Sequence, residues 1–150
     1  MKHRRSDPHR GVFRAREATT AIEFAICAMA IVLLVVGFAE FGRIVWTYEV
    51  LQEVAAESAR CMGLRANACA SAGVYNLSNT LSYVVSLTKS HGVAIQTSMV
   101  SLSNVATCGG AAGFSQVSIN YDLISMAPRL LTSLRGGMIM TASACFPNNG

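Results

Sequence analysis

The longest apolar stretch of the chain lies near its N-terminus and predicts a membrane-spanning helix. Residues 24–39 carry no charge. At a rise of about 1.5 Å per residue they cover roughly 24 Å, and an extension back to Thr19 gives about 31 Å, which matches a hydrocarbon core of ~30 Å. The extension contains Glu23. A carboxylate in hydrocarbon is costly, so Glu23 either has a positive partner there or lies at the headgroup boundary, where its side chain can reach water.

The hydrophobic pattern continues past this stretch at helical spacing. Apolar residues recur at intervals of four, three and four, with acidic and amide side chains elsewhere on the helical wheel; they are Ile44, Tyr48, Leu51 and Ala55. No proline interrupts residues 19–60. We therefore expect one long helix over 19–60, with a transmembrane part at about 19–42 and an amphipathic part that packs on a folded domain.

Four polar and aromatic residues are expected where this helix leaves the membrane. Glu40 and Arg43 are three residues apart, so they lie on one helix face and are predicted to form an ion pair. Trp46 and Tyr48 follow, and their amphipathic rings suit the headgroup region.

Residues 61–150 are expected to form an extracytoplasmic domain with a second helix and a small antiparallel sheet. Apolar residues at helical spacing predict the helix at 72–90, ended by Gly92. Alternation predicts strands from Val93 to Met99, around 117–121, and at 138–145, with a turn at Gly109-Gly110. Pro128 falls in the predicted connection between the second and third of these strands, and this connection ends at Gly136-Gly137. The fold class is therefore α+β, with helices layered against the sheet.

The net charge of +4 is concentrated at the N-terminus. Six of the twelve Lys and Arg residues lie in residues 1–18, and the rest of the chain has six basic and six acidic residues. A basic segment before an apolar one indicates the cytoplasmic side of a membrane. Nucleic-acid binding is not expected, because it requires basic residues spread over a folded surface. Residues 1–18 also lack apolar periodicity, so we expect them to be disordered.

Five cysteines occur, and four of them follow the apolar stretch. Cys27 lies inside that stretch, where a free thiol behaves as a small hydrophobe. Two disulfides are predicted, in an oxidising compartment, among Cys61, Cys69, Cys108 and Cys145. Three connectivities are open, and Cys61–Cys69 with Cys108–Cys145 is favoured because the first pair is local. A zinc site would require closer paired spacings.

No set of residues typical of an enzyme is found in the sequence. Two of the three histidines precede the apolar stretch, and His91 stands at a predicted helix end. Phosphate-binding loops and metalloprotease motifs are absent. Glu49, Glu53 and Glu57 are spaced as a solvated helix face. We predict no catalytic residues, metal or cofactor, and a small exported hydrolase or binding module is the weakest alternative.

The N-terminal segment resembles the TadE/TadG-like minor pilins of tight-adherence (Flp-type) pilus systems. The resemblance is carried by Arg14-Ala15-Arg16-Glu17-Ala18, then Thr19-Thr20-Ala21-Ile22 and Glu23-Phe24. It continues through residues 40–43 and 57–61 and returns weakly near 142–147. It implies a basic leader, residues 1–18, cut by a prepilin peptidase between Ala18 and Thr19. Gly is usual before such a cut, and Ala18 occupies that position here.

The resemblance also implies a function and a location. Glu23 would become the fifth residue of the mature chain and pair with the N-terminal amine of a neighbouring pilin subunit, with Phe24 beside it. The chain would be inserted in a bacterial inner membrane with its N-terminus in the cytoplasm and its domain in the periplasm, and then enter a pilus as a minor or priming subunit. The alternative is an uncleaved single-pass anchor that acts as a scaffold or adaptor of a secretion machine. Neither the target of the pilus nor the exact role follows from the sequence.

Overall fold

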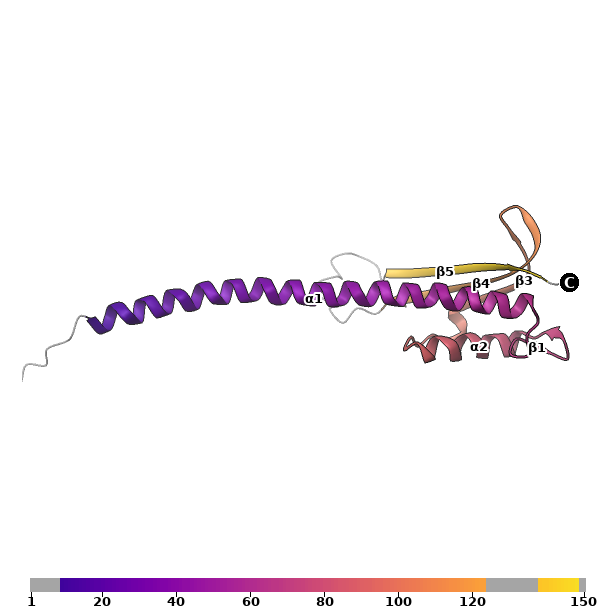
Figure 1. The fold of residues 1–150 in the computed structure, drawn as a ribbon, viewed down its shortest axis with the longest axis horizontal. Coiled ribbons are helices and arrows are strands. Elements are labelled where there is room, and N and C mark those ends of the chain that lie inside the picture. The colour runs from indigo at the N-terminus through magenta and orange to yellow at the C-terminus, as the bar shows by residue number, and fades with distance from the viewer. Residues whose placement is uncertain (1–8, 124–137, 149–150) are drawn as a thin grey trace, which may run out of the picture. The chain divides into compact units, whose positions relative to one another are not determined.

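The computed structural model describes residues 9–123 and 138–148, and its first element is helix α1, His9–Gly63 (Figure 1). The helix begins ten residues before Thr19, so the expectation that all of residues 1–18 are disordered is wrong for 9–18. The Arg14-Ala15-Arg16-Glu17 segment consists of good helix formers, and no proline follows Pro8 there. The chain divides into two compact units, Met1–Phe41 and Gly42–Gly150.

The end of α1 is fixed by the first disulfide. Cys61 bonds Cys69, with their Cα atoms 5.9 Å apart. Beyond Gly63 the chain turns back, with a positive φ of 51° at Arg65. The amide of Ala66 donates a hydrogen bond to the carbonyl of Cys61 at 3.1 Å. The favoured local pairing is therefore the one present in the structure.

A two-stranded hairpin precedes the second helix. Strands β1, Ala70–Ser71, and β2, Val74–Tyr75, pair antiparallel, and helix α2 runs from Leu77 to Ser90. The predicted start at residue 72 is five residues too early. Positive φ angles at Ala72 and Gly73, 51° and 76°, make a turn there. Asn76 then caps α2, because its Oδ1 accepts a hydrogen bond from the Asn79 amide at 3.0 Å.

The strand predicted from Val93 begins later. Residues 93–96 are irregular, Thr97–Met99 form a single 3₁₀ turn (η1), and strand β3 spans Val100–Cys108. Val93 and Ile95 are buried and alternate with exposed residues, but no described strand pairs with them. Their apolar side chains belong to the core although their backbone does not join the sheet, so alternation here indicates burial and not a strand.

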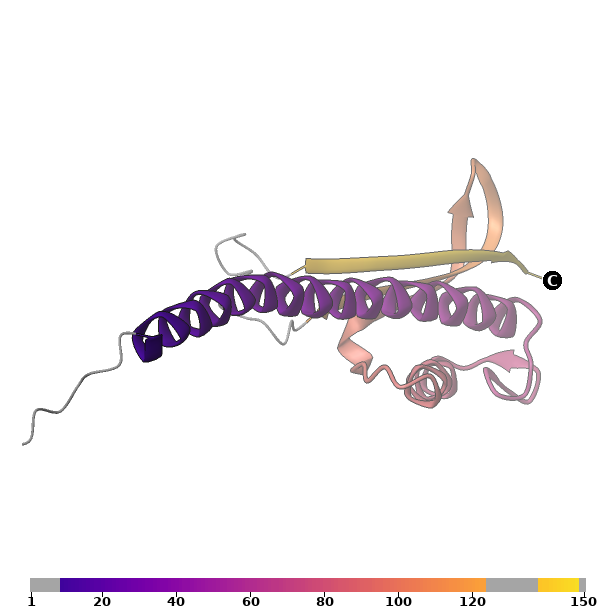
Figure 2. The same ribbon diagram turned by 60° about the vertical axis from the view of Figure 1, so that its left-hand side comes forward.

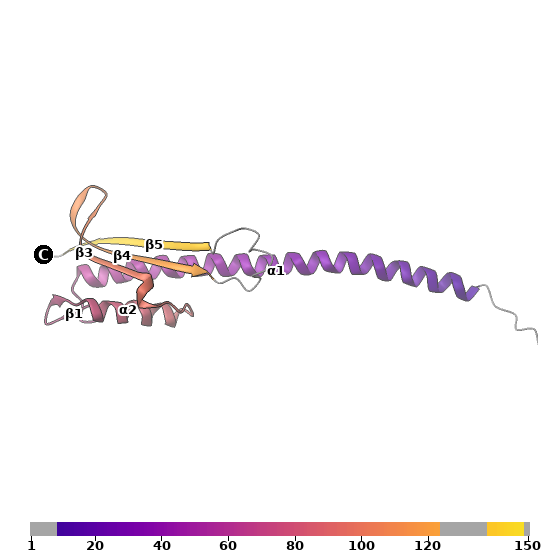
Figure 3. The same cartoon turned by 180° about the vertical axis from the view of Figure 1, so that it is seen from behind.

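The main sheet contains β3, β4 (Ala111–Leu123) and β5 (Met138–Pro147), all antiparallel, in the order β3-β4-β5. Gly109 and Gly110 form the predicted turn, with φ angles of 60° and 85° that suit a two-residue hairpin. The hairpin that they close projects beyond the rest of the sheet (Figure 3). The predicted second and third strands are confirmed. The connection with Pro128 and Gly136-Gly137 lies outside the described residues.

The core of the second unit lies around the second half of α1. In Figures 1 and 2 this part of α1 runs between the sheet and α2. Leu51, Val54 and Ala55 are fully buried, and so are Val84 of α2 and Ile119 of β4. Tyr48 departs from the predicted apolar face, because its side chain is 42% exposed. Two helices with small antiparallel sheets confirm the α+β class.

Candidate functional site: an exposed apolar helix

The first half of α1 exposes an unusually apolar surface. Large apolar side chains project around the whole helix, including Ile22, Met29, Leu33 and Phe38, each more than half exposed. The segment Thr20–Gly63 contains a stretch long and apolar enough to cross a membrane, with a mean hydropathy of 2.6, and none of that stretch is buried. Such a surface is unfavourable in water. It fits membrane anchoring, or packing among other apolar helices.

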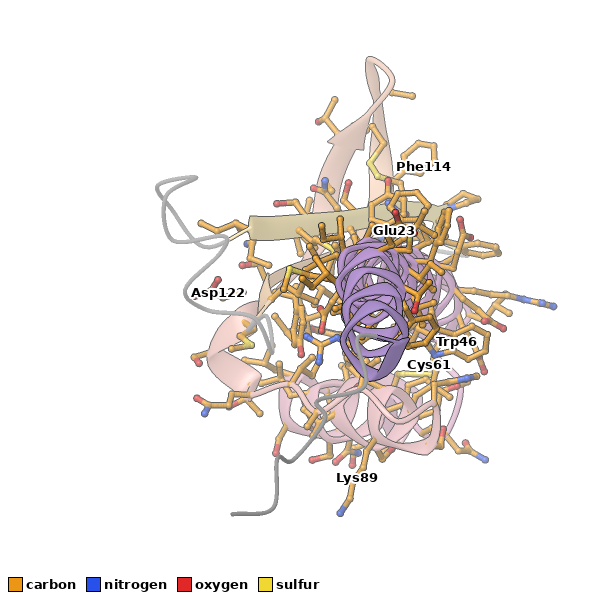
Figure 4. All side chains as sticks on the ribbon, turned by 90° about the vertical axis from the view of Figure 1, so that its left-hand side faces the viewer. Glu23, Trp46, Cys61, Lys89, Phe114 and Asp122 are labelled. Carbon is orange, nitrogen blue, oxygen red and sulfur yellow. A yellow bond between two sulfur atoms is a disulfide. The ribbon has the colours of Figure 1, made fainter. Side chains whose placement is uncertain are left out.

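Glu23 and Phe24 lie at the start of this surface. Both side chains are exposed, Phe24 at 75%. Figure 4 views the helix from this end and labels Glu23. Within the described residues, Glu23 forms no hydrogen bond or ion pair. Ala18 and Thr19 are in the same helix, and Thr19 precedes Glu23 by one helical turn. Leader cleavage here and pairing of Glu23 remain predictions.

The residues expected at the membrane boundary lie on α1 as predicted from their spacing. The side chains of Glu40 and Arg43 are partly buried, and an ion pair between these two remains a prediction. Trp46 is 62% exposed and projects from one side of α1 (Figure 4). The Tyr48 hydroxyl accepts a hydrogen bond from Gln52 Nε2 at 3.1 Å. Both aromatic rings are available to a headgroup layer or to a partner.

A hydrogen bond between α1 and α2 was not foreseen from the sequence. The Tyr83 hydroxyl donates to Glu57 Oε1 at 2.7 Å. Partial burial, together with the hydrogen bond and the negative charge of Glu57, raises the pKa of Tyr83 to about 12. The spacing of Glu57 with Glu49 and Glu53 indicated only a solvated face. Glu57 in fact ties the two helices together.

A polar cluster at the C-terminal end of β5 was also missed. Asn104, Ser115 and Asn148 come from β3, β4 and the residue after β5. Ser115 is buried and its hydroxyl contacts Oδ1 of both asparagines. Asn148 Nδ2 donates to the Asn104 carbonyl at 2.7 Å, and the Asn148 amide donates to the Gly113 carbonyl at 2.9 Å. Sequence separations of up to 44 residues hide this cluster from local patterns.

The cluster satisfies the backbone where β3 is irregular. The pairing of β3 with β4 shifts between Ser103 and Ala106, so Asn104 is outside the regular ladder. A buried carbonyl without a partner would cost about 1–3 kcal/mol. The side chain of Asn148 supplies that partner, and the second disulfide, Cys108–Cys145, fastens the same end of the sheet.

The five cysteines comprise two disulfides and one free thiol. All four cysteines beyond the apolar stretch are in disulfides with the favoured connectivity, which removes the thiolates that a zinc site would need. Cys27 is free and exposed on α1. Across residues 9–123 and 138–148, no group of three or more His, Cys, Asp or Glu side chains could hold a metal ion.

The exposed apolar half of α1 fits membrane anchoring, and the helix continues into a small, disulfide-bonded α+β domain. Residues 18–60 match the family model described as TadE-like protein, so the predicted resemblance is confirmed over this segment. No curated protein matches the chain, and no solved structure does. The TadE-like match implies a pilin-like protein associated with a tight-adherence pilus, and that family is structural and non-enzymatic.

Proposed function

We propose that this chain is a minor pilin or pseudopilin, a structural subunit that assembles or primes a tight-adherence type IV pilus. The observation that carries the proposal is a carboxylate, Glu23, near the start of the first half of α1, where the large apolar side chains from Ile22 to Phe41 are exposed. The TadE-like match at 18–60 includes this segment. In a bundle of such helices the apolar side chains would be buried, and the carboxylate would require a positive partner.

The proposed partner of Glu23 is the N-terminal amine that cleavage after Ala18 would create on Thr19. An α-amine is largely protonated near neutral pH. Within one chain the helix holds Thr19 and Glu23 one turn apart. The amine of a neighbouring subunit is not held at that separation, so it can approach the carboxylate directly. An isolated charge in hydrocarbon is expensive, so pairing across subunits favours the docked arrangement over unpaired ones.

Substitution of Glu23 tests the role in assembly. Glu23→Ala and Glu23→Gln should give chains that are inserted and processed normally but recovered in sheared fibres at less than a tenth of the wild-type amount. Glu23→Asp, which keeps the charge, is the matched control and should retain partial assembly. Fibres at wild-type levels from Glu23→Gln would remove the charge-pairing argument.

N-terminal sequencing of the membrane and fibre forms tests the leader separately. The mature chain should begin at Thr19, and Ala18→Arg should block processing while leaving insertion intact. A stable chain that still carries residues 1–18 would instead support the second candidate, an uncleaved anchor that serves as a scaffold of a secretion machine. Two observations favour that candidate: Ala18 occupies the position where Gly is usual, and α1 passes through Ala18–Thr19 without interruption.

A minor pilin has a defined location and defined partners. The chain would be handled by a prepilin peptidase, reside in the inner membrane with a cytoplasmic N-terminus, and contact other pilin subunits through α1. The basic residues before the span support this orientation. The two disulfides support a domain on the oxidising, periplasmic side.

A further inference from the structure

Strand β5 forms a long, regular edge of the main sheet. In the order β3-β4-β5 only one side of β5 is paired, and every residue from Met138 to Pro147 pairs with β4 without a shift in register. Figure 1 shows β5 as an outer strand of the sheet, with β4 next to it. Along that edge, β5 makes no backbone hydrogen bond to any residue that the structure describes.

Neither edge strand carries a charge. Met138–Pro147 and Val100–Cys108 contain no Asp, Glu, Lys or Arg, and Asp122 is the only charged residue of the three strands. Sheets of monomeric proteins usually protect their edges with charges, prolines or bulges. β3 has a register shift after Ser103, whereas β5 has only Pro147, at its last position. Ile139 near the start of β5 is 70% exposed.

The side chains on the two edges match a sheet that continues from one molecule to the next. On the face toward the core, Leu102 of β3 and Ala144 and Phe146 of β5 are only partly buried. On the opposite face, Ser101 and Ser143 are exposed. If β3 of another molecule followed β5, apolar side chains would meet on the core face and hydroxyls on the outer face.

The direction of the strands also permits this contact between copies of the chain. β3 and β5 are both antiparallel to β4, so they run parallel to each other. Copies that one membrane anchors through the same helix point the same way. The β5 edge of one copy can therefore meet the β3 edge of the next in parallel, with both cores on the same side. Such a contact is heterologous, so it can join two copies or continue through several.

We propose that β5 pairs with β3 of a second copy of this chain, so that the sheet continues between neighbouring subunits. The inference rests on the proposed function insofar as copies share one membrane and one orientation. Parallel pairing is slightly weaker per residue than antiparallel pairing, but confinement in one membrane raises the effective concentration of the edges. The uncharged strands place no like charges opposite each other.

A row of three serines provides the test. Ser101, Ser118 and Ser143 are neighbours across β3, β4 and β5, all on the outer face. In the full chain, Ser143→Lys with Ser101→Lys should reduce fibre recovery at least tenfold, since two cations would face each other between copies. Ser143→Lys with Ser101→Glu should restore recovery to within about twofold of wild type. Ser118→Lys on the central strand is the matched control and should change nothing.

Each other result would overturn the inference. Wild-type recovery from the double-lysine chain would show that the edges do not meet. An equal loss from Ser118→Lys would indicate contact through the outer face. Failure of the Lys–Glu chain to recover, with circular dichroism unchanged, would indicate that β5 meets a different protein. Normal fibre assembly in cells that lack this chain would contradict the proposed function. The pairing of β5 with β3 is then tested with the same variants by photochemical cross-linking between copies in the membrane.

Discussion

At the scale of single residues, the clearest constraint is Gly63 at the end of α1. A Cβ atom placed there would lie 2.6 Å from Phe146 Cδ1 and 2.8 Å from the Pro147 carbonyl oxygen. The absence of a side chain therefore lets the end of the helix touch the end of β5. Neither local helix propensity nor the apolar pattern indicates this requirement, because Gly63 and Phe146 are distant in sequence.

Gly63→Ala should consequently destabilise the domain by about 1–3 kcal/mol, because the backbone of Pro147 cannot yield as a flexible side chain would. The measurement is thermal unfolding of the full chain in detergent, followed by circular dichroism. Gly42→Ala is the matched control, since an added Cβ there meets no atom within 4 Å. It should be neutral or slightly stabilising. Equal effects of the two substitutions would contradict the proposed close contact.

The Tyr83–Glu57 hydrogen bond predicts how stability responds to alkaline pH. The pKa of Tyr83 is raised from 10.0 to about 12 in the folded protein. Its stabilising contribution is therefore fully present below about pH 10 and is lost as the pH rises toward 12. Tyr83→Phe should be less stable than wild type at pH 8, and the difference should shrink between pH 10 and 12. A constant difference across that range, in denaturant titrations, would rule out the assigned linkage.

At the scale of elements, the sequence indicates helices and strands well where a local signal coincides with the tertiary contacts. The Gly109-Gly110 turn, the alternation in β4 and the apolar periodicity of α1 are of this kind. The start of α2 was missed because Ala72 adopts a positive φ, which its residue type disfavours. Alternation at Val93 and Ile95 indicated a strand, but those residues fill a core from an irregular segment. Burial and strand pairing are separate properties. The alternation of apolar residues in a single sequence indicates burial, but it does not indicate pairing.

At the scale of the whole molecule, the sequence contains the candidate assembly segment but not the features that hold the domain together. Glu23 and the apolar stretch are contiguous, so their role can be inferred from local spacing and from the family resemblance. The cluster of Asn104, Ser115 and Asn148 joins three separate parts of the chain. Likewise, the open edge of β5 becomes evident only when the strand order is known. Contacts between distant segments are what the structure adds.

The second disulfide has a consequence for the order in which the domain matures. Cys108 belongs to β3, whereas its partner Cys145 is near the end of β5, the last strand to leave the ribosome. The Cys61–Cys69 bridge can close while most of the domain is still being synthesised. The Cys108–Cys145 bridge can close only after β5 has been synthesised and both thiols are in oxidising conditions. A chain that ends before β5 would therefore contain the Cys61–Cys69 bridge and an unpaired Cys108 thiol in the β3–β4 hairpin.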